Sequence, residues 1–234
     1  MGHVVALIPA AGRGLRMGLD IGKPYVPLCG RPVLAHTVDA FDRCPHVDGC
    51  VLVVDPERQE HCRTHVVEAF GYRRVWRIVP GGATRQESVY RGLQAIEGDA
   101  DIVIVHDGVR PLIEPEVIEE SVVLCRTHGA VLVAVPVKET IKIVHDGVVV
   151  ATPDRATLWA AQTPQTFSYA LLRDAHERAR ADGYEGTDDA ALVERLGHRV
   201  TILRGSYENI KLTTPEDVVV AEQILRRRGN SRVR

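Results

Sequence analysis

A chain of 234 residues, of which 45% are hydrophobic and 26% are charged, has the composition of a globular protein with a sizeable core. Its formal net charge of −2 argues against nucleic acid as the main partner, and no apolar run is long enough to cross a membrane. The five cysteines are scattered without a C-x-x-C pair, and the N-terminus has no signal-peptide pattern. We therefore expect reduced thiols and a cytoplasmic location.

Six short apolar runs, rich in β-branched residues and without clean alternation, predict strands that are covered on both faces. They are residues 4–9, 50–54, 75–80, 102–106, 131–137 and 200–203. Helices are predicted between and after them, several with a proline near the first turn. They are residues 32–44, 56–70, 84–96, 115–128, 167–182, 187–196 and 215–227. The alternation predicts an α/β fold with a mostly parallel sheet and helices on both faces, and we expect residues 1–234 to form one domain.

A loop rich in small residues follows the first predicted strand and runs from Pro9 to Lys23. Small residues after a buried strand let backbone N–H groups approach a ligand closely, and Arg16 and Lys23 add two cations. Amides that cradle oxygens and cations that neutralise them suit the triphosphate of a nucleotide. An ordinary glycine-rich turn with surface charges is the alternative for this loop by itself.

Four further strand ends carry polar and small residues of the same kinds. They are residues 81–88, 106–111, 138–140 and 205–211. Because ligands bind outside the carboxyl ends of the strands in open α/β sheets, we expect these segments to converge with the first loop on one rim. Asp107 could hold a divalent ion or a sugar hydroxyl there, or cap the next turn. The five segments together predict a phosphate-rich site.

One segment, residues 138–154, departs from the alternation of strand and helix. Residues 140–144 and 148–150 are predicted to be two short strands around the Asp146-Gly147 turn, which is typical of a β-hairpin. This hairpin could project as an arm that pairs with a second subunit, or it could fold back on its own domain.

Three common motifs are excluded. A dinucleotide-binding fingerprint needs G-x-G-x-x-G, but Met17 stands at the third glycine position after Gly12 and Gly14. A Walker A loop needs Ser or Thr after its lysine, but Pro24 follows Lys23. The sequence also has no G-x-S-x-G elbow for a nucleophilic serine.

Taken in chain order, the motifs resemble those of a known family. Residues 9–17, Lys23 and residues 27–34 are similar to the signature of sugar-phosphate nucleotidyltransferases. Five later motifs are similar to those of the 2-C-methyl-D-erythritol 4-phosphate cytidylyltransferase family, and the match covers nearly the whole chain. They are residues 81–89, 106–111, 162–165, 187–189 and 209–217.

The resemblance implies a Rossmann-like fold and an enzyme that joins CTP and methylerythritol phosphate. The sugar phosphate would attack the α-phosphate of CTP in line, giving the CDP-linked product and diphosphate. The resemblance also implies Mg²⁺ as cofactor and a homodimer in which a β-arm, here residues 138–154, completes the partner's site. The partners would then be CTP and a polyol phosphate, with neither nucleic acid nor a membrane.

The resemblance further implies roles for individual residues. Four cations would act on the phosphates in catalysis: Arg16, Lys23, Arg155 and Lys211. The nucleotide would be bound by residues of the first loop and of later strand ends: Pro9, Ala10, Ala11, Gly12, Gly14, Gly82, Arg85, Ser88, Asp107 and Gly108. The sugar phosphate would be bound by Asp107, Arg110, Thr140, Arg155, Thr187 and Lys211. Asp107 would also be the magnesium ligand.

Two departures from the pattern of the family leave alternatives open. Residues 22–25 are Gly-Lys-Pro-Tyr where the family usually has Pro-Lys-Gln-Tyr, and residues 108–109 are Gly-Val where Ala-Ala is common. The second dipeptide also varies in the related ribitol-5-phosphate cytidylyltransferases, so ribitol phosphate is the first alternative substrate. A non-catalytic nucleotide-sensing module with the same fold is the second alternative.

Overall fold

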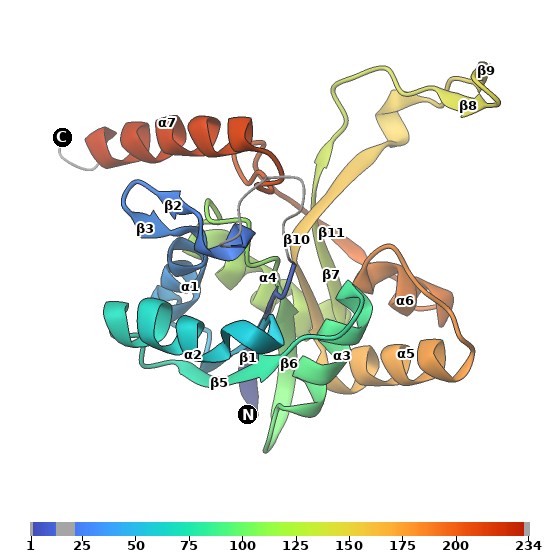
Figure 1. Cartoon of the computed structure of the whole chain (residues 1–234). Helices are drawn as coiled ribbons and strands as arrows, with labels where there is room; N and C mark the ends of the chain where they lie inside the picture. The colour runs from blue at the N-terminus through green and yellow to red at the C-terminus, as the bar shows by residue number, and fades with distance from the viewer. Residues whose placement is uncertain (1, 13–21, 232–234) are drawn as a thin grey trace.

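The computed structural model describes residues 2–12 and 22–231, and within them seven strands form one sheet (Figure 1). The strand order is β11-β7-β10-β6-β1-β4-β5. These strands are β1 His3–Ala10, β4 Gly49–Val54, β5 Val75–Pro80, β6 Ala100–Val105, β7 Ala130–Pro136, β10 Trp159–Ser168 and β11 Thr201–Arg204. Neighbouring strands are parallel except that β10 runs antiparallel to both β6 and β7. The predicted mostly parallel sheet is therefore confirmed.

Helices cover both faces of this sheet, as the sequence predicts. One layer consists of α1 (Val33–Arg43), α2 (Gln59–Cys62) and α4 (Pro115–His128). The other consists of α3 (Arg85–Gln94), α5 (Tyr169–Ala181) and α6 (Asp189–Arg195). Strand β1 serves both layers, because Val4, Ala6 and Ile8 pack into the first and Val5 and Leu7 into the second. Side chains alternate across a strand, so a strand between two cores is apolar throughout.

The last helix, α7 (Pro215–Ser231), lies outside these two layers. It packs beside the small hairpin of β2 (Pro27–Leu28) and β3 (Arg31–Pro32) and is drawn above the sheet in Figure 1. A separate apolar cluster joins Leu28 and Val33 to Leu212 and Ala221. Among the described residues, no helix combines the length and the apolar character that crossing a bilayer requires.

Strand β10 is absent from the sequence-based prediction. Half of residues 159–168 are polar and Pro164 lies among them, so no long apolar run marks them as a central strand. In the structure, Phe167 pairs with Val103 of β6 and with Ala130 of β7. The register with β7 shifts in the part of the strand that contains Pro164, where a proline interrupts regular pairing. The two neighbouring strands therefore define β10 more than its own composition does.

Most predicted helices differ from the observed ones by a few residues at their ends, and two of the differences have a clear structural basis. The helix predicted from residue 167 begins at Tyr169, because the Ser168 hydroxyl caps it by accepting a hydrogen bond from the N–H of Leu171 at 3.3 Å. The helix predicted over residues 56–70 is instead a 3-10 turn (Pro56–Arg58), then α2, then a π-helical turn (Arg63–Glu68).

The predicted hairpin is present and projects from the sheet as an arm (Figure 1). It consists of β8 (Ile143–His145) and β9 (Val148–Ala151). Its turn residues Asp146 and Gly147 both have positive φ, 48° and 78°. Positive φ at both central residues is the feature of a type I′ turn, whose twist matches that of the paired strands.

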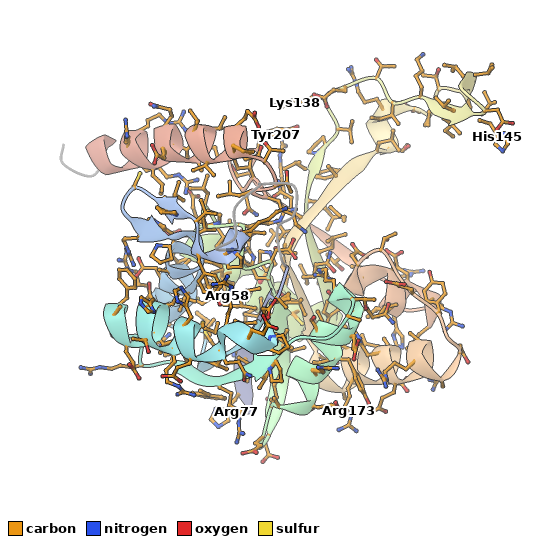
Figure 2. All side chains as sticks on the ribbon, in the orientation of Figure 1. Arg58, Arg77, Lys138, His145, Arg173 and Tyr207 are labelled. Atoms are coloured by element: carbon orange, nitrogen blue, oxygen red, sulfur yellow. The ribbon has the colours of Figure 1, made fainter. Side chains whose placement is uncertain are left out.

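The base of the arm is held against the loop that precedes Lys211. The Lys138 ammonium lies 3.5 Å from the centre of the Tyr207 ring, and the Tyr207 hydroxyl donates to the Pro136 carbonyl at 2.7 Å. Figure 2 shows Lys138 and Tyr207 near this base and His145 at the far tip. The arm thus leaves the sheet from an anchored base.

Candidate active site

The segments that follow β1, β5, β6 and β11 line a cavity of about 230 Å³ at the carboxyl edge of the sheet. Four of the five strand ends that the sequence analysis singles out therefore meet in one place. The predicted site residues in its lining are Pro9, Ala10, Ala11, Gly12, Lys23, Gly82, Arg85, Ser88, Asp107 and Lys211. Three of these are cations, so the cavity suits an anionic ligand.

The loop between β5 and α3 is ordered by its own side chains. Thr84 caps α3 by accepting a hydrogen bond from the N–H of Glu87 at 3.1 Å, and the Glu87 carboxylate accepts one from the N–H of Ala83 at 2.8 Å. The Ser88 hydroxyl accepts from the N–H of Gly82 at 3.0 Å and donates to the Thr84 carbonyl at 2.9 Å. These bonds hold the loop in place along the cavity wall.

Two glycines permit the close approach of the segments around this cavity. A Cβ on Gly81 would lie 2.4 Å from the Cβ of Ala11, and a Cβ on Gly108 would lie 2.8 Å from that of Ala10. Any larger residue would push these segments apart. Gly108 also donates from its N–H to the Pro9 carbonyl at 3.0 Å. Gly108, a predicted nucleotide contact, is not among the lining residues and supports the first loop instead.

A second cavity, of about 250 Å³, adjoins the first and shares Arg85, Asp107 and Lys211 with it. It adds Arg110 and Thr187, both predicted to bind the sugar phosphate. The rest of its lining comes from β10 and from the residue before α6: Ala161, Gln162, Thr163, Gln165 and Asp188. Two cavities joined by two cations and a carboxylate can hold two anionic ligands next to each other.

Asp107 is the centre of a charge cluster at this boundary. Its Oδ1 accepts from Arg85 Nε at 3.2 Å, and its Oδ2 lies 3.0 Å from the Lys211 ammonium. Arg110 Nε is 3.5 Å from Oδ2, and the Asp107 side chain is only 9% exposed. Burial alone would raise the pKa of Asp107, but the attraction of Arg85, Lys211 and Arg110 outweighs it and holds that pKa well below its usual range. Asp107 is therefore an anion that orients all three cations.

Asp107 is also the residue that the resemblance makes a magnesium ligand. Protein sites for Mg²⁺ usually combine one or two carboxylates with phosphate oxygens and water. Within the described residues, Asp107 is the only carboxylate lining the first cavity, and both its oxygens are ion-paired. Nor does the described part of the chain contain a group of three or more His, Cys, Asp or Glu side chains that could hold a metal ion. These side chains do not form a metal site by themselves, and the magnesium role of Asp107 stays a prediction.

A chain of hydrogen bonds holds Asp107 from the core side. The N–H of Asp107 donates to the Thr163 hydroxyl at 3.1 Å, and that hydroxyl donates to His106 Nδ1 at 3.0 Å. His106 Nε2 donates to the Arg110 carbonyl at 3.1 Å. Because the Arg110 carbonyl can only accept, Nε2 carries a proton, and in the neutral ring Nδ1 is then the acceptor for the Thr163 hydroxyl. Burial lowers the pKa of His106 to about 4, in agreement with these bonds.

Stability is expected to fall as the pH is lowered from 6.5 towards 4. Burial takes the pKa of His106 from an ordinary 6.5 in the unfolded chain to about 4 in the folded protein. Between these values only the unfolded chain binds the proton, so acid favours unfolding. The free energy of unfolding in urea should be about 2 kcal/mol lower at pH 5 than at pH 7 through this residue. A smaller drop is expected in His106→Gln, and a drop equal to that of the native protein would contradict the assignment.

Besides Gly108, two predicted site residues lie outside both cavities, and two more fall outside the described residues. Thr140 and Arg155 belong to the arm and its return segment, are exposed, and line neither cavity of their own chain. The Arg155 guanidinium instead donates to the Lys138 carbonyl at 2.9 Å. Gly14 and Arg16 lie outside the described residues, so their roles stay predictions.

The sequence analysis assigns no role to the polar residues of β10 that line the second cavity. Gln165 Nε2 donates to the Asp188 carboxylate at 2.9 Å, and Gln165 Oε1 accepts from the N–H of Ala190 at 3.0 Å. Gln165 thereby joins β10 to the start of α6, next to Thr187. The Gln-Thr-Pro-Gln motif of residues 162–165, which belongs to the resemblance, is the signal that points to them.

Comparisons with known proteins agree with this geometry. A sequence model of the 2-C-methyl-D-erythritol 4-phosphate cytidylyltransferase family matches residues 4–227. Proteins of that name from Geotalea uraniireducens and Desulforamulus reducens are 52% identical over 227 residues and 49% identical over 230 residues. These matches cover 96% of this chain and 97% of the first protein, and 98% of this chain and 98% of the second. The solved 4-diphosphocytidyl-2C-methyl-D-erythritol synthase of Anaerococcus prevotii is similar with a TM-score of 0.86 and 33% identity, covering 96% of each chain.

A mostly parallel α/β sheet with two cation-lined cavities at its carboxyl edge defines a nucleotidyltransferase of the sugar-phosphate type. The chain belongs to the 2-C-methyl-D-erythritol 4-phosphate cytidylyltransferase family. The prediction of an enzyme that uses CTP and methylerythritol phosphate is thereby confirmed, and neither the ribitol-phosphate enzyme nor the non-catalytic nucleotide sensor is favoured.

Proposed function

We propose that this enzyme joins CTP and 2-C-methyl-D-erythritol 4-phosphate, with release of diphosphate, across the boundary between its two cavities. The observation that carries the proposal is that both cavities share Arg85, Asp107 and Lys211. A nucleotide in the first cavity and a sugar phosphate in the second would meet at these side chains.

The reaction needs charge neutralisation rather than a general base. The attacking sugar phosphate is already an anion at neutral pH, and it must approach the anionic α-phosphate of CTP. Catalysis then depends on positioning and on stabilising the charge that develops. Lys23 and Arg16 would act on the α-phosphate and the departing diphosphate, and Lys211 on the incoming phosphate. The presence of Lys23 in the first cavity and of Lys211 in both supports these roles.

The remaining lining residues would bind and orient the two substrates. Arg110 and Thr187 line the second cavity, which supports contact with the sugar phosphate. Ala10, Ala11 and Gly82 line the first, where small side chains allow backbone groups to contact the edge of the cytosine ring.

Diphosphate release tests the proposal directly. Purified protein, Mg²⁺ and CTP are mixed with methylerythritol phosphate, with ribitol 5-phosphate, or with neither. We expect diphosphate only with the first of these. Faster release with ribitol 5-phosphate would replace the proposed substrate, and CTP binding without any diphosphate release would support a nucleotide sensor instead.

We further propose Mg²⁺ as the cofactor, held mainly by triphosphate oxygens and water because the first cavity offers a single carboxylate among the described residues. We also propose that the whole chain works as one domain in the cytoplasm. Its five cysteines are all free thiols, which is the usual state of thiols in a reducing compartment.

Two copies of the chain are proposed to pair through the arm, residues 138–154. Five β-branched side chains along β8 and β9 are 50–66% exposed: Ile143, Val144, Val148, Val149 and Val150. Apolar strands exposed in this way are usually covered by a partner. Thr140 lies in the arm and Arg155 directly follows it, and both are outside the two cavities of their own chain. Pairing would let each arm bring them to the second cavity of the other copy.

The double variant Val144→Asp/Val149→Asp is expected to be monomeric. Val144 and Val149 are cross-strand partners, so the two new charges would repel each other on the hairpin. An apolar interface would also have to bury both charges, which is unfavourable. Sedimentation velocity should show a dimer for the native protein and a monomer for the variant. Diphosphate release should fall about tenfold or more, because Arg155 would no longer be positioned by the partner.

Val219→Asp is the matched control for this variant, because Val219 is a similarly exposed valine on α7. It should change neither the sedimentation nor the rate. A double variant that remains dimeric, or a monomer with native activity, would contradict the role of the arm.

A further inference from the structure

A second carboxylate, Asp189, lies behind Arg85 in the core. Arg85 Nη1 donates to Asp189 Oδ2 at 2.7 Å, a shorter bond than the 3.2 Å from its Nε to Asp107. The Asp189 side chain is 1% exposed, whereas that of Arg85 is 30% exposed. Asp189 is the first residue of α6, and Arg85 is the first residue of α3. One guanidinium therefore connects a core carboxylate to the carboxylate at the boundary of the two cavities.

The other oxygen of Asp189 is held by a buried histidine. Asp189 Oδ1 accepts from His176 Nε2 at 2.9 Å, and the His176 side chain is fully buried. The ring of His176 also stacks on Tyr90 of α3, with the ring centres 6.4 Å apart. Because His176 belongs to α5, the helices α3, α5 and α6 all contribute side chains to this hydrogen-bonded series.

The hydrogen-bonded series His176–Asp189–Arg85 buries polar groups in the core, and stability alone does not explain why they are there. Within the described residues, Nδ1 of His176 is buried and has no hydrogen-bond partner. Buried polar atoms are nearly always paired, and ionic groups in a core are often no more stabilising than apolar residues of the same size. A buried Asp–His pair directly behind a residue that lines both cavities is better explained by what it does to that residue.

The geometry of arginine indicates how Asp189 acts on Arg85. A guanidinium has five N–H donors in a rigid planar fork, and a carboxylate readily takes two of them at once. Arg85 instead divides its donors between Asp189 and Asp107. The charge of Asp189 therefore prevents Arg85 from turning both donors to Asp107. If it did turn, it would compete for the Asp107 oxygen that pairs with Lys211.

We propose that Asp189 and His176 are positioning residues for the transfer reaction. They hold Arg85 across the boundary of the two cavities and, through Asp107, keep Lys211 in its place. Neither residue lines a cavity, so both act through Arg85 rather than on a substrate. This inference rests on the proposed function, because it concerns the same site.

Asp189→Asn tests the inference. Asparagine keeps the size of the side chain but removes the charge that directs Arg85, and its single acceptor oxygen cannot accept from both Arg85 and His176. We expect kcat per folded enzyme to fall about tenfold or more, since small displacements of groups near the reacting atoms have effects of this size. The KM for CTP should change less, because most of the first cavity is intact. A purely structural role would lower the melting temperature and leave kcat unchanged.

Two variants of His176 provide an independent test if Asp189→Asn does not fold. In His176→Gln the amide can still donate to Asp189, whereas in His176→Leu a side chain of similar size cannot. We expect kcat to be lowest in His176→Leu and largely restored in His176→Gln. Equal kcat values in the two variants would overturn the positioning role.

Asp182→Asn is the matched control. Asp182 accepts from Arg195 Nη2 at 2.7 Å and so also links the end of α5 to α6, but at the exposed surface. The kcat of Asp182→Asn should equal that of the native enzyme. The native enzyme in the same assay separates the two proposals: without diphosphate release from it, the proposed function fails. If the native enzyme is active and Asp189→Asn has the same kcat, only the positioning role fails.

Discussion

Lys23→Ala is expected to lower kcat about a hundredfold, which corresponds to roughly 3 kcal/mol of transition-state stabilisation. Lys23 lines the first cavity, with Arg85 and Lys211 at its boundary. Its ammonium would act where negative charge grows as the diphosphate leaves. A fixed cation stabilises this charge without reorganisation, whereas the water that replaces it in the variant must reorient to do so. The loss should therefore appear in kcat more than in the KM for CTP.

Initial rates of diphosphate release at saturating concentrations of both substrates measure this effect. Arg173→Ala is the control, because it also removes a cation, here one that forms an exposed ion pair with Glu177. Figure 2 shows Arg173 on the side of the molecule away from the arm and α7. Native turnover is expected for this control. If Lys23→Ala also turned over at the native rate, Lys23 would have no part in the mechanism.

Asp107→Asn is expected to lower the free energy of unfolding by about 3 kcal/mol. The buried Asp107 carboxylate is the counterion of Arg85, Arg110 and Lys211. Asparagine has nearly the same shape but no charge, so the cations would repel each other around a side chain that is itself only 9% exposed. Because net stabilities are about 5–15 kcal/mol, this change would be a large fraction of the total.

Urea unfolding at pH 7 measures this change. Asp174→Asn is the control, since it removes the carboxylate of an exposed pair with Arg178 and should change stability by less than about 0.5 kcal/mol. Adding Arg110→Gln to Asp107→Asn should recover part of the loss, because it removes one of the uncompensated charges. Equal unfolding free energies for the native protein and Asp107→Asn would mean that water screens the cluster.

Local chemistry accounts for the parts of the fold that the sequence predicts. The predicted strand over residues 50–54 is β4, which is buried along its whole length, because parallel strands between two helix layers must be apolar on both faces. The hairpin is predicted from Asp146 and Gly147, because few other residues adopt positive φ at two successive turn positions. Both signals act over a few residues, so they are readable in the sequence.

Strand β10 has no such local signal. Half of its residues are polar, and Pro164 argues against a central strand. It becomes one because β6 and β7 offer their free edges on either side and supply the backbone hydrogen bonds. Whether these edges lie side by side with a gap between them depends on how strands distant in the sequence are arranged, and this is decided only when the chain folds.

The same division applies to the site. The sequence by itself determined which residue types stand at the strand ends, and Lys23, Arg85, Asp107 and Lys211 were all singled out from it. Only the tertiary structure decided their pairing: Asp107 with three cations, and Arg85 with Asp189, which lies 104 positions further along the chain. The physical reason is that electrostatic attraction depends on the distance between charges in space and on their burial, neither of which is a function of sequence separation.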